Sequence, residues 1–323
     1  MFSLVQKRRW FYLFSAVIII PGVLIMLYSL ITTGSLFRLS NDFVGGSIYD
    51  LRFAGEGATE SNIREVFTRN GNSDISIQQL DNPNDPNDEH RWSVRASFQD
   101  SETSNTIIRE LGELAPLDQD SLRVEQVSPT VGREVTQSAV VAVLMATAIV
   151  TMFIVLAFRQ VPNAFRYGIC AIAAMVHDVL VVCGIMSLLG LLLGWEVDAL
   201  FLTAILTVVG YSIQDTIVMF DRIRENIPKH LGEPFETIVN RSVLETMHRS
   251  LATQLNAFFV MIAILLFGGE SIKQFIGILF VGLLTGTYSS IFIAVPLLVS
   301  IEKGEIPFLR PRPPKLTTAE AEG

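Results

Sequence analysis

An aspartate lies within an apolar stretch of sequence that predicts a membrane-spanning helix. Asp215, preceded by Gln214, stands in an apolar run that covers residues 197 to 220. A charged side chain at the centre of a membrane helix costs roughly 2.5 to 3.5 kcal/mol on insertion scales, so it usually faces a partner or water and often marks an ion path. The position of Asp215 therefore predicts that it takes part in the movement of a proton or another ion. The alternative is a static ion pair with Arg222 or Arg249 near the cytoplasmic end of the helix.

Neighbouring apolar runs contribute further polar residues. His177 and Asp178 are adjacent, and the sequence leaves structural hydrogen bonding and ion relay open for this pair. Spacings of three and four predict that polar residues share one side of each of two helices. In the run of Asp215 these residues are Thr203, Thr207, Gly210, Tyr211, Gln214 and Asp215, and in the run that follows Arg249 they are Arg249, Thr253 and Asn256.

Charged and small residues near these runs predict surfaces rather than chemistry. Charges are common at the boundary of a membrane, so the cluster after residue 220 predicts a solvated or docking face. Gly282 and Gly286 have the G-x-x-x-G spacing that permits close helix packing, together with Gly277, and a partner subunit could use the same face. The charged cluster consists of Asp221, Arg222, Arg224 and Glu225.

The elements that must position these residues are membrane helices. The chain has 323 residues, of which 50% are hydrophobic, and a mean hydropathy of +0.44. The apolar residues form blocks of about 17 to 25 residues, a length that spans a bilayer core of roughly 30 Å. The first block lacks a small-x-small cleavage site, so we interpret it as a retained anchor. The six blocks are residues 10–31, 138–158, 167–193, 197–220, 251–267 and 275–300.

The basic residues predict the orientation of these helices. Short cytoplasmic loops are enriched in Lys and Arg, and the opposite loops here carry mainly acidic residues. Six spans with both termini in the cytoplasm satisfy this distribution. The basic residues assigned to the cytoplasm are Lys7, Arg8, Arg9, Arg159, Arg166, Arg222, Arg224, Lys229, Arg241, Lys303, Arg310, Arg312 and Lys315.

Residues 35–136 predict one α+β domain outside the membrane. Two helical patterns alternate with four strand patterns in the order β-α-β-β-α-β, which is ferredoxin-like. This segment contains no lysine and about twice as many Asp and Glu as Arg, which disfavours nucleic acid as a partner. The expected strands are residues 47–53, 75–80, 91–98 and 121–127, the expected helices are residues 59–71 and 100–114, and residues 81–90 form a loop.

Signatures of soluble enzymes are missing from the sequence. It contains no P-loop, no G-x-S-x-G, no H-E-x-x-H and no cysteine pair at zinc spacing. Both cysteines, Cys170 and Cys183, lie in the third apolar block, which excludes a disulfide framework for the domain outside the membrane. We therefore expect no catalytic activity, no metal site and no cofactor, and any ATP hydrolysis must come from another protein.

Several motifs resemble those of the SecF proteins, accessory subunits of the bacterial and archaeal preprotein translocase within the RND superfamily. The resemblance covers nearly the whole chain, including the six-helix plan. Ser40 and Gln214 depart from the residues that are usual in the family, a Gly and an Asn. The matching motifs are Asn41-Asp42-Phe43-Val44-Gly45-Gly46, Ala174-Met175-Val176-His177-Asp178, Gly210-Tyr211-Ser212-Ile213-Gln214-Asp215, Asp221-Arg222-Ile223-Arg224-Glu225-Asn226, Thr246-Met247-His248-Arg249-Ser250 and Phe267-Gly268-Gly269.

This resemblance implies a function, partners and a location. A SecF protein works with SecD in the prokaryotic cell (inner) membrane and uses the proton motive force in late stages of export of a preprotein chain through SecYEG. YajC and YidC are further candidate partners. The residues matching Asp215 and Arg249 are implied to take part in the proton path, and we group Gln214, Asp178 and His177 with them. The coupling ion is H⁺, with Na⁺ as the alternative.

Domain boundaries and two rival functions complete the expectations. We expect a cytoplasmic N-terminus with the first helix in residues 1–34, the external domain in 35–136, five helices of an RND-type bundle in 137–302, and a cytoplasmic tail in 303–323. An intramembrane aspartyl protease would use Asp178 and Asp215, but the G-x-G-D of such proteases is missing. An RND exporter of small molecules or lipids normally has two six-helix halves in one chain, and only one is present.

Overall fold

The structure is a computed structural model that describes residues 4–55, 57–73, 75–80, 90–159 and 164–306. Nearly all of the loop expected at residues 81–90, and most of the expected tail, lie outside these residues. The chain divides into two compact units, and each is described by itself. The helical unit comprises the residues up to Arg38 and those from Val143 onward, and the α+β unit comprises Leu39–Ala142.

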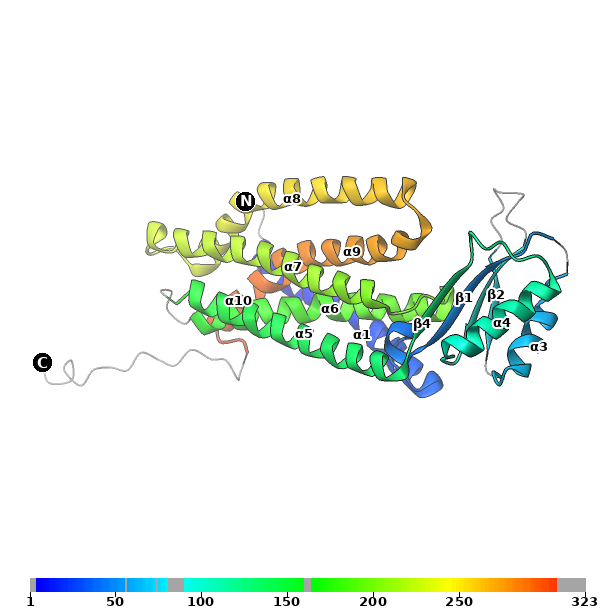
Figure 1. The fold of residues 1–323 in the computed structure, drawn as a ribbon. Coiled ribbons are helices and arrows are strands. Elements are labelled where there is room, and N and C mark those ends of the chain that lie inside the picture. The colour runs from blue at the N-terminus through cyan, green and yellow to red at the C-terminus, as the bar shows by residue number, and fades with distance from the viewer. Residues whose placement is uncertain (1–3, 56, 74, 81–89, 160–163, 307–323) are drawn as a thin grey trace, which may run out of the picture. The chain divides into compact units, whose positions relative to one another are not determined.

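Six helices within the described residues are long and apolar enough to cross a membrane, which confirms the predicted number of spans. Figure 1 shows them running alongside one another. Several extend beyond their apolar blocks, and α8, with 33 residues, has a length of about 50 Å, well above the thickness of a bilayer core. The spans are formed by α1 (Arg8–Thr33), α5 (Pro129–Ala157), α6 (Ala164–Leu193), α7 (Ala199–Asn226), α8 (Phe235–Phe267) and α9 (Glu270–Ser289) with its continuation.

The sixth span changes its winding near its middle. After α9, residues Ser290–Ala294 form a π-helical turn, η3, and α10 (Val295–Glu302) then completes the span. Pro296 has no backbone N–H and its ring crowds the carbonyl four residues earlier, so an ordinary helix is disfavoured at this point. The wider π turn before this proline resolves the conflict, and such turns are frequent at functional sites.

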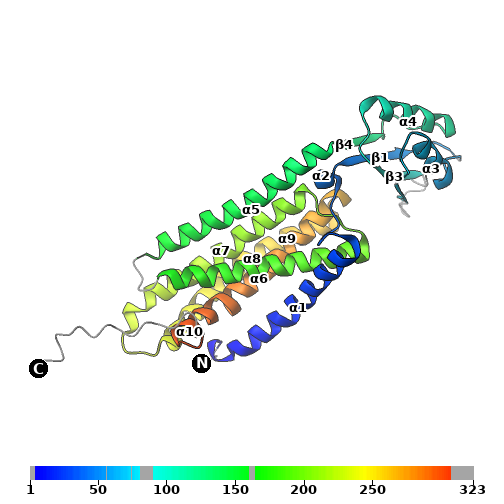
Figure 2. The same cartoon turned by 90° about the horizontal axis from the view of Figure 1, so that it is seen from below.

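The two ends of the helical unit's sequence meet at one side of it. Near its start, Arg8 contacts Glu236 at 3.1 Å and also pairs with Glu305. Arg166, at the start of α6, pairs with Glu302. Figure 2 shows the first turn of α1 beside α10. The first and last spans therefore end at the same side, as an even number of spans requires.

The α+β unit has the predicted ferredoxin-like topology. The four strands form one sheet in the order β2-β3-β1-β4, and all neighbouring strands are antiparallel. Tyr49 faces Val94 on one side and Val124 on the other, and it is buried against Phe67 and Ile107 in the core of the unit. The elements are β1 (Gly46–Arg52), α3 (Glu60–Arg69), β2 (Ser76–Gln79), β3 (Arg91–Ala96), α4 (Ser101–Leu114) and β4 (Arg123–Val127).

The motif at residues 41–46 forms the entry to β1. Asn41–Val44 is the short helix α2, and Ser40 caps it by accepting a hydrogen bond from the Asp42 N–H at 3.3 Å. Phe43 is buried, and Gly45 and Gly46 have φ angles of 82° and 147°. A Cβ at Gly45 would lie 2.8 Å from the backbone of Pro129, so this glycine permits a close approach of two segments.

The boundary of the α+β unit differs from the expected residues 35–136. Helix α5 begins at Pro129, nine residues before the apolar block, because the polar residues that precede the block also form helix. The first part of α5, up to Ala142, clusters with the sheet. The compact unit thus starts and ends a few residues later than the sequence indicated.

Replacement of Asp100 tests the N-terminal cap of α4. Hydrogen bonds from the Thr103 hydroxyl and from its N–H, the latter at 2.9 Å, hold the pKa of Asp100 below its usual value. The stability that this carboxylate contributes is present above the unfolded-state pKa and is lost as the pH falls through the folded-state pKa. We expect Asp100→Ala to lower the unfolding temperature of the α+β unit at neutral pH, by an amount that shrinks on acidification.

Fluorescence of the buried Trp92 measures this unfolding in a chain whose Trp10 and Trp195 are replaced by Phe. Asp100→Asn is the matched control, because asparagine caps helices as well as aspartate does but carries no charge. Equal destabilisation by Asp100→Asn and Asp100→Ala would contradict the capping role.

Candidate ion-coupling site

Helix α7 presents its polar residues on two faces, which corrects the prediction of a single polar side. Gln214, Tyr211 and Thr203 are exposed on the helical unit, whereas Asp215 is buried at 8% exposure together with Ser212. Successive residues of an α-helix are turned by about 100°, so Asp215 points away from Gln214 and toward the interior of the unit. The polar residues at spacings of three and four around Gln214 instead form an outward face.

Asp215 contacts an amide rather than an arginine. Its Oδ2 accepts a hydrogen bond of 2.6 Å from Nε2 of Gln254, which is buried on α8. Arg249 is exposed on the same helix, and no ion pair joins it to Asp215 within the described residues. The alternative of a static ion pair between Asp215 and Arg222 or Arg249 is therefore not seen among the described residues, and Arg222 pairs with Glu245 and Glu225 instead.

The charged run at the end of α7 connects that helix to α8. Arg222 contacts Glu245 at 2.7 Å and Glu225 at 2.9 Å, and Arg224 contacts Asp221 at 2.8 Å. These pairs make the run a structural network as well as a partly exposed surface. Asn226 is buried and donates to Ser242 and Glu245, at 3.0 and 2.9 Å.

A cavity of about 340 Å³ lies beside this network. Arg249 lines this cavity together with the acidic residues of the network, and Asp215 does not line it. A cavity of this size with several charged lining groups has room for water. The residues that line it are Ile217, Val218, Asp221, Arg222, Glu225, Glu245, Thr246 and Arg249.

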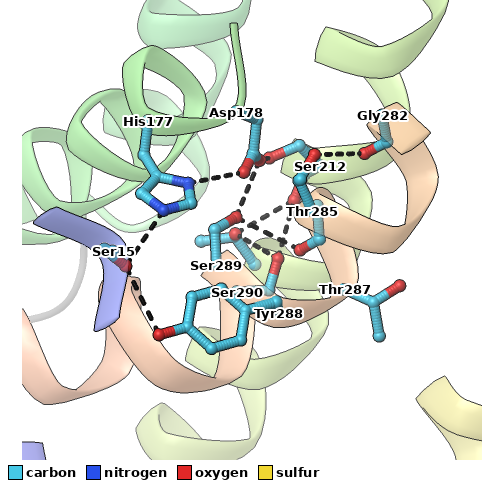
Figure 3. A network of polar contacts seen from close by, with 12 residues as sticks. Ser15, His177, Asp178, Ser212, Gly282, Thr285, Thr287, Tyr288, Ser289 and Ser290 are labelled. Carbon is cyan, nitrogen blue, oxygen red and sulfur yellow. Dashed lines mark hydrogen bonds and ion pairs between the residues drawn. The ribbon is translucent and has the colours of Figure 1, made fainter. Parts of the chain in front are cut away.

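His177 and Asp178 form the centre of a second, buried cluster (Figure 3). The Nδ1 atom of His177 lies 2.9 Å from Asp178 Oδ1, and its Nε2 atom lies 3.0 Å from the hydroxyl of Ser15 on α1. Asp178 Oδ2 accepts hydrogen bonds from Ser212 at 2.5 Å and from Ser289 at 2.7 Å. The cluster therefore joins α1, α6, α7 and α9.

Hydroxyl groups extend this cluster on both sides. Ser15 donates to the Tyr288 hydroxyl at 3.3 Å, and Tyr288 donates to the Phe11 carbonyl at 3.0 Å. On the other side, Thr216 and Ser290 contact each other at 2.9 Å, and Ser290 donates to the carbonyl of Ser212 at 3.1 Å. Ser289 and Ser290 lie where α9 changes into the π turn, which directs both side chains toward α6 and α7.

Small residues allow the helices to approach closely enough for these bonds. A Cβ at Gly286 would lie 3.3 Å from Cα of Ser212, and a Cβ at Gly282 would lie 2.1 Å from Cγ2 of Val208. Both predicted packing glycines thus lie against α7. Gly22 of α1 and Gly184 of α6 form a similar contact, which the sequence analysis did not identify.

Burial determines what Asp178 can do chemically. It is 1% exposed, and its partners are His177 and hydroxyl groups rather than Lys or Arg. An unpaired buried carboxylate is very costly, so the charge must be balanced by a proton on the carboxyl or on the imidazole. The arrangement is suited to binding and releasing a proton.

The two membrane aspartates do not form the dyad of an aspartyl protease. A dyad requires two carboxyls that share one proton. Here Asp178 contacts His177 and two serines, whereas Asp215 contacts Gln254. Among the described residues, no group of three or more His, Cys, Asp or Glu side chains is placed to hold a metal ion.

Comparisons with known proteins agree with this architecture. The family model of the SecD/SecF protein export membrane protein, C-terminal, matches residues 106–304. The SecF translocase subunit of Anaerolinea thermophila is 42% identical over 94% of this chain and 96% of its own length, and that of Thermobaculum terrenum is 40% identical over 96% of each. The crystal structure of SecDF from Thermus thermophilus, described as a translocon-associated membrane protein, superposes with a TM-score of 0.72 at 30% identity.

The SecF relatives match this chain over nearly their whole length, whereas the SecDF chain is much longer than this one. The SecDF structure matches 93% of this chain, but this chain spans only 38% of the SecDF chain. Six candidate membrane spans among the described residues, with a ferredoxin-like unit inserted after the first, define a multi-pass membrane protein. The chain belongs to the SecF family of protein translocase subunits.

Proposed function

We propose that this chain couples an ion gradient to protein export, with Asp215 as the residue that binds and releases the coupling proton. In this proposal it works with SecD at the SecYEG channel, with both termini in the cytoplasm and the α+β unit outside. YajC and YidC are further candidate partners, and the exported preprotein is the chain that is moved. H⁺ is the coupling ion that the site favours, and Na⁺ is the alternative.

The observation that carries the proposal is the contact between Asp215 and Gln254. A neutral amide stabilises the carboxylate by a hydrogen bond of 2.6 Å, and the carboxyl group can take up a proton without leaving an unpaired cation behind. With a buried arginine as partner, protonation would leave such a cation, at a cost of about 3 to 5 kcal/mol. The structure therefore gives Asp215 a partner that tolerates both protonation states.

Arg249 has a different place in this proposal from the one inferred from sequence. It lies on α8, five residues before Gln254, and lines the cavity beside the ends of α7 and α8. We assign it to a later step, in which α8 moves and the guanidinium meets the ionised Asp215. Gln214, on the outward face of α7, is assigned to contact with SecD rather than to the proton itself.

The energy of one proton is sufficient for a change of this size. Moving one charge through 100 mV supplies about 2.3 kcal/mol, and each pH unit of gradient adds about 1.4 kcal/mol. Converting a two-state equilibrium from 1:99 to 99:1 takes about 5.5 kcal/mol. One proton thus shifts the helices substantially, and a second proton site would complete the shift.

Gradient-dependent completion of preprotein translocation in vesicles tests the proposal. The vesicles contain the chain with SecD and the channel, and the variants are Asp215→Asn and Arg249→Met. We expect both variants to assemble with SecD and to lose the gradient-dependent step. Asp215→Asn removes the group that binds the proton, and Arg249→Met removes the cation that the ionised Asp215 meets in the later step. Retention of that step by both assembled variants would contradict the proposal.

Asp198→Asn is the matched control on the same helix. Asp198 caps α7 by accepting from the Phe201 N–H at 2.7 Å, and asparagine serves equally well as a cap. It makes the same chemical change as Asp215→Asn, outside the buried part of the helix. We expect this variant to export like the wild type.

A further inference from the structure

The directions of the hydrogen bonds determine how many protons the His177–Asp178 pair holds. Tyr288 has one hydroxyl hydrogen, and it donates this hydrogen to the Phe11 carbonyl at 3.0 Å. Ser15 must then supply the hydrogen of the Ser15–Tyr288 bond, as its geometry shows. Since the one hydroxyl hydrogen of Ser15 is used in this way, its contact with His177 requires the imidazole to donate. His177 therefore carries a hydrogen on Nε2.

The other side of the imidazole fixes the second hydrogen. His177 Nδ1 and Asp178 Oδ1 are 2.9 Å apart, a distance that requires one hydrogen between them. Asp178 Oδ2 already receives the hydroxyl hydrogens of Ser212 and Ser289. The pair is therefore either imidazolium with carboxylate or imidazole with carboxylic acid. Both forms are neutral overall, and both hold one proton more than a neutral imidazole beside a carboxylate.

Release of that proton requires the chain of hydroxyls to reverse. The remaining hydrogen must lie on Nδ1, because a bare Nδ1 facing a carboxylate would bring two lone pairs together. Nε2 then becomes an acceptor, so Ser15 turns to donate to it. Tyr288 loses the hydrogen bond from Ser15, and it restores the contact by donating to Ser15 instead of to Phe11.

We propose that His177 and Asp178 form a second proton-binding site, whose occupancy is transmitted through Ser15 and Tyr288 as the making or breaking of the hydrogen bond to the Phe11 carbonyl of α1. Helix α1 is the span that leads along the chain into the α+β unit. Its packing on α6 and α9 thus depends on whether the pair holds the proton. The use of this site in export rests on the proposed function, but its proton binding does not.

The side chains that face the His177–Asp178 pair come from three other helices and carry no charge. Helix α1 contributes Ser15, α7 contributes Ser212, and α9 contributes Ser289 and the phenol of Tyr288. Of these neighbours only Tyr288 is titratable, and within the described residues no Lys, Arg or second carboxylate contacts the pair. Proton exchange at this cluster therefore falls to the imidazole and its carboxyl partner.

Nitrogen-15 NMR of histidine-labelled full-length protein in lipid bilayers tests this site. The chain has four histidines, and loss of a signal in His177→Gln assigns the relevant one. In the wild type we expect Nε2–H at acidic pH and conversion to Nδ1–H with a bare Nε2 as the pH rises. A histidine that keeps Nε2–H at every pH, or one whose Nε2 is bare at every pH, would overturn the proposal.

Tyr288→Phe tests the hydroxyl chain, and Tyr12→Phe is its matched control. Tyr12 is a second tyrosine of the helical unit that bonds a serine, Ser300 at 3.3 Å, but it lies outside the chain of bonds to His177. Without the Tyr288 hydroxyl, Ser15 is free to donate to Nε2, so the ratio of Nε2–H to bare Nε2 should fall about fivefold, the value of one net hydrogen bond. Ser15→Ala should lower it in the same direction.

An unchanged ratio in both Tyr288→Phe and Ser15→Ala, or an equal change in Tyr12→Phe, would overturn the proposed transmission. The measurement needs neither SecD nor an ion gradient. Failure of the Asp215 variants to alter export would therefore leave its result standing, and failure of the NMR prediction would leave the role of Asp215 untouched.

Discussion

Gly282→Val is expected to remove most of the folded protein from the membrane. A Cβ at this position would lie 2.1 Å from Cγ2, 2.9 Å from Cγ1 and 3.0 Å from Cβ of Val208. Val208 is β-branched and buried on α7, and a β-branched side chain in a helix has one strongly preferred χ1 rotamer, so it withdraws only at a cost. Helices α7 and α9 must separate, and we expect a loss of more than about 3 kcal/mol, above the usual range for overpacking. Protein level in membranes and thermal unfolding in detergent measure it.

Gly277→Val is the matched control on the same helix. A Cβ at Gly277 would have as its nearest neighbour Cη2 of Trp195 at 3.6 Å, an ordinary contact distance. Gly210→Val on α7 is a second control, because nothing lies within 4 Å of its added Cβ. Wild-type levels of folded Gly282→Val, or equal losses in the controls, would show that α7 and α9 are not packed as closely as described.

The spans and the α+β topology could be predicted because each rests on a local pattern. A bilayer requires about 20 apolar residues for each helix, and this requirement marks all six spans. In the α+β unit, alternation places Tyr49 and Leu51 on the buried face of β1, and Thr59 caps α3 through the Asn62 N–H at 3.3 Å. Helix ends were less predictable, because α5 and α8 continue through polar residues that have ordinary helix propensity.

The partner of Asp215 could not be predicted, because it depends on the rotation and crossing of two helices. Arg249 and Gln254 are five residues apart on α8, and opposite charge favoured the arginine. The packing of α8 on α7 instead places Gln254 inside and Arg249 outside. Residue type indicated a polar partner on this helix, but only the tertiary structure shows which one.

The hydroxyls around Asp178 were missed for a related reason. Serine and threonine in membrane helices commonly bond the carbonyl four residues earlier, as Thr207 does to Thr203 at 2.8 Å and Thr151 does to Thr147. Ser212 and Ser289 look the same in sequence, yet both donate to Asp178. The adjacent pair of serines before Pro296 was the one available signal, because a proline inside a span frees carbonyls and changes the direction of neighbouring side chains.

Asp178→Ala is expected to destabilise the helical unit by about 2 to 6 kcal/mol. The substitution removes the acceptor of His177 and of Ser212, both of which are buried, and each buried donor left without a partner costs about 1 to 3 kcal/mol. Ser289 loses less, because the Gly286 carbonyl at 3.2 Å is a second acceptor for its hydroxyl. Thermal unfolding in detergent or unfolding by increasing fractions of denaturing detergent measures the difference.

A double-mutant cycle distinguishes this network from a general loss of packing. Asp178→Asn keeps one carbonyl oxygen of similar shape, so it should cost less than Asp178→Ala. In the Asp178→Ala background, Ser212→Ala removes a hydroxyl that no longer has an acceptor, so its cost should fall below its cost in the wild type, or change sign. Strict additivity of the two substitutions would mean that Ser212 and Asp178 do not interact, and that the carboxyl group is balanced by His177 alone.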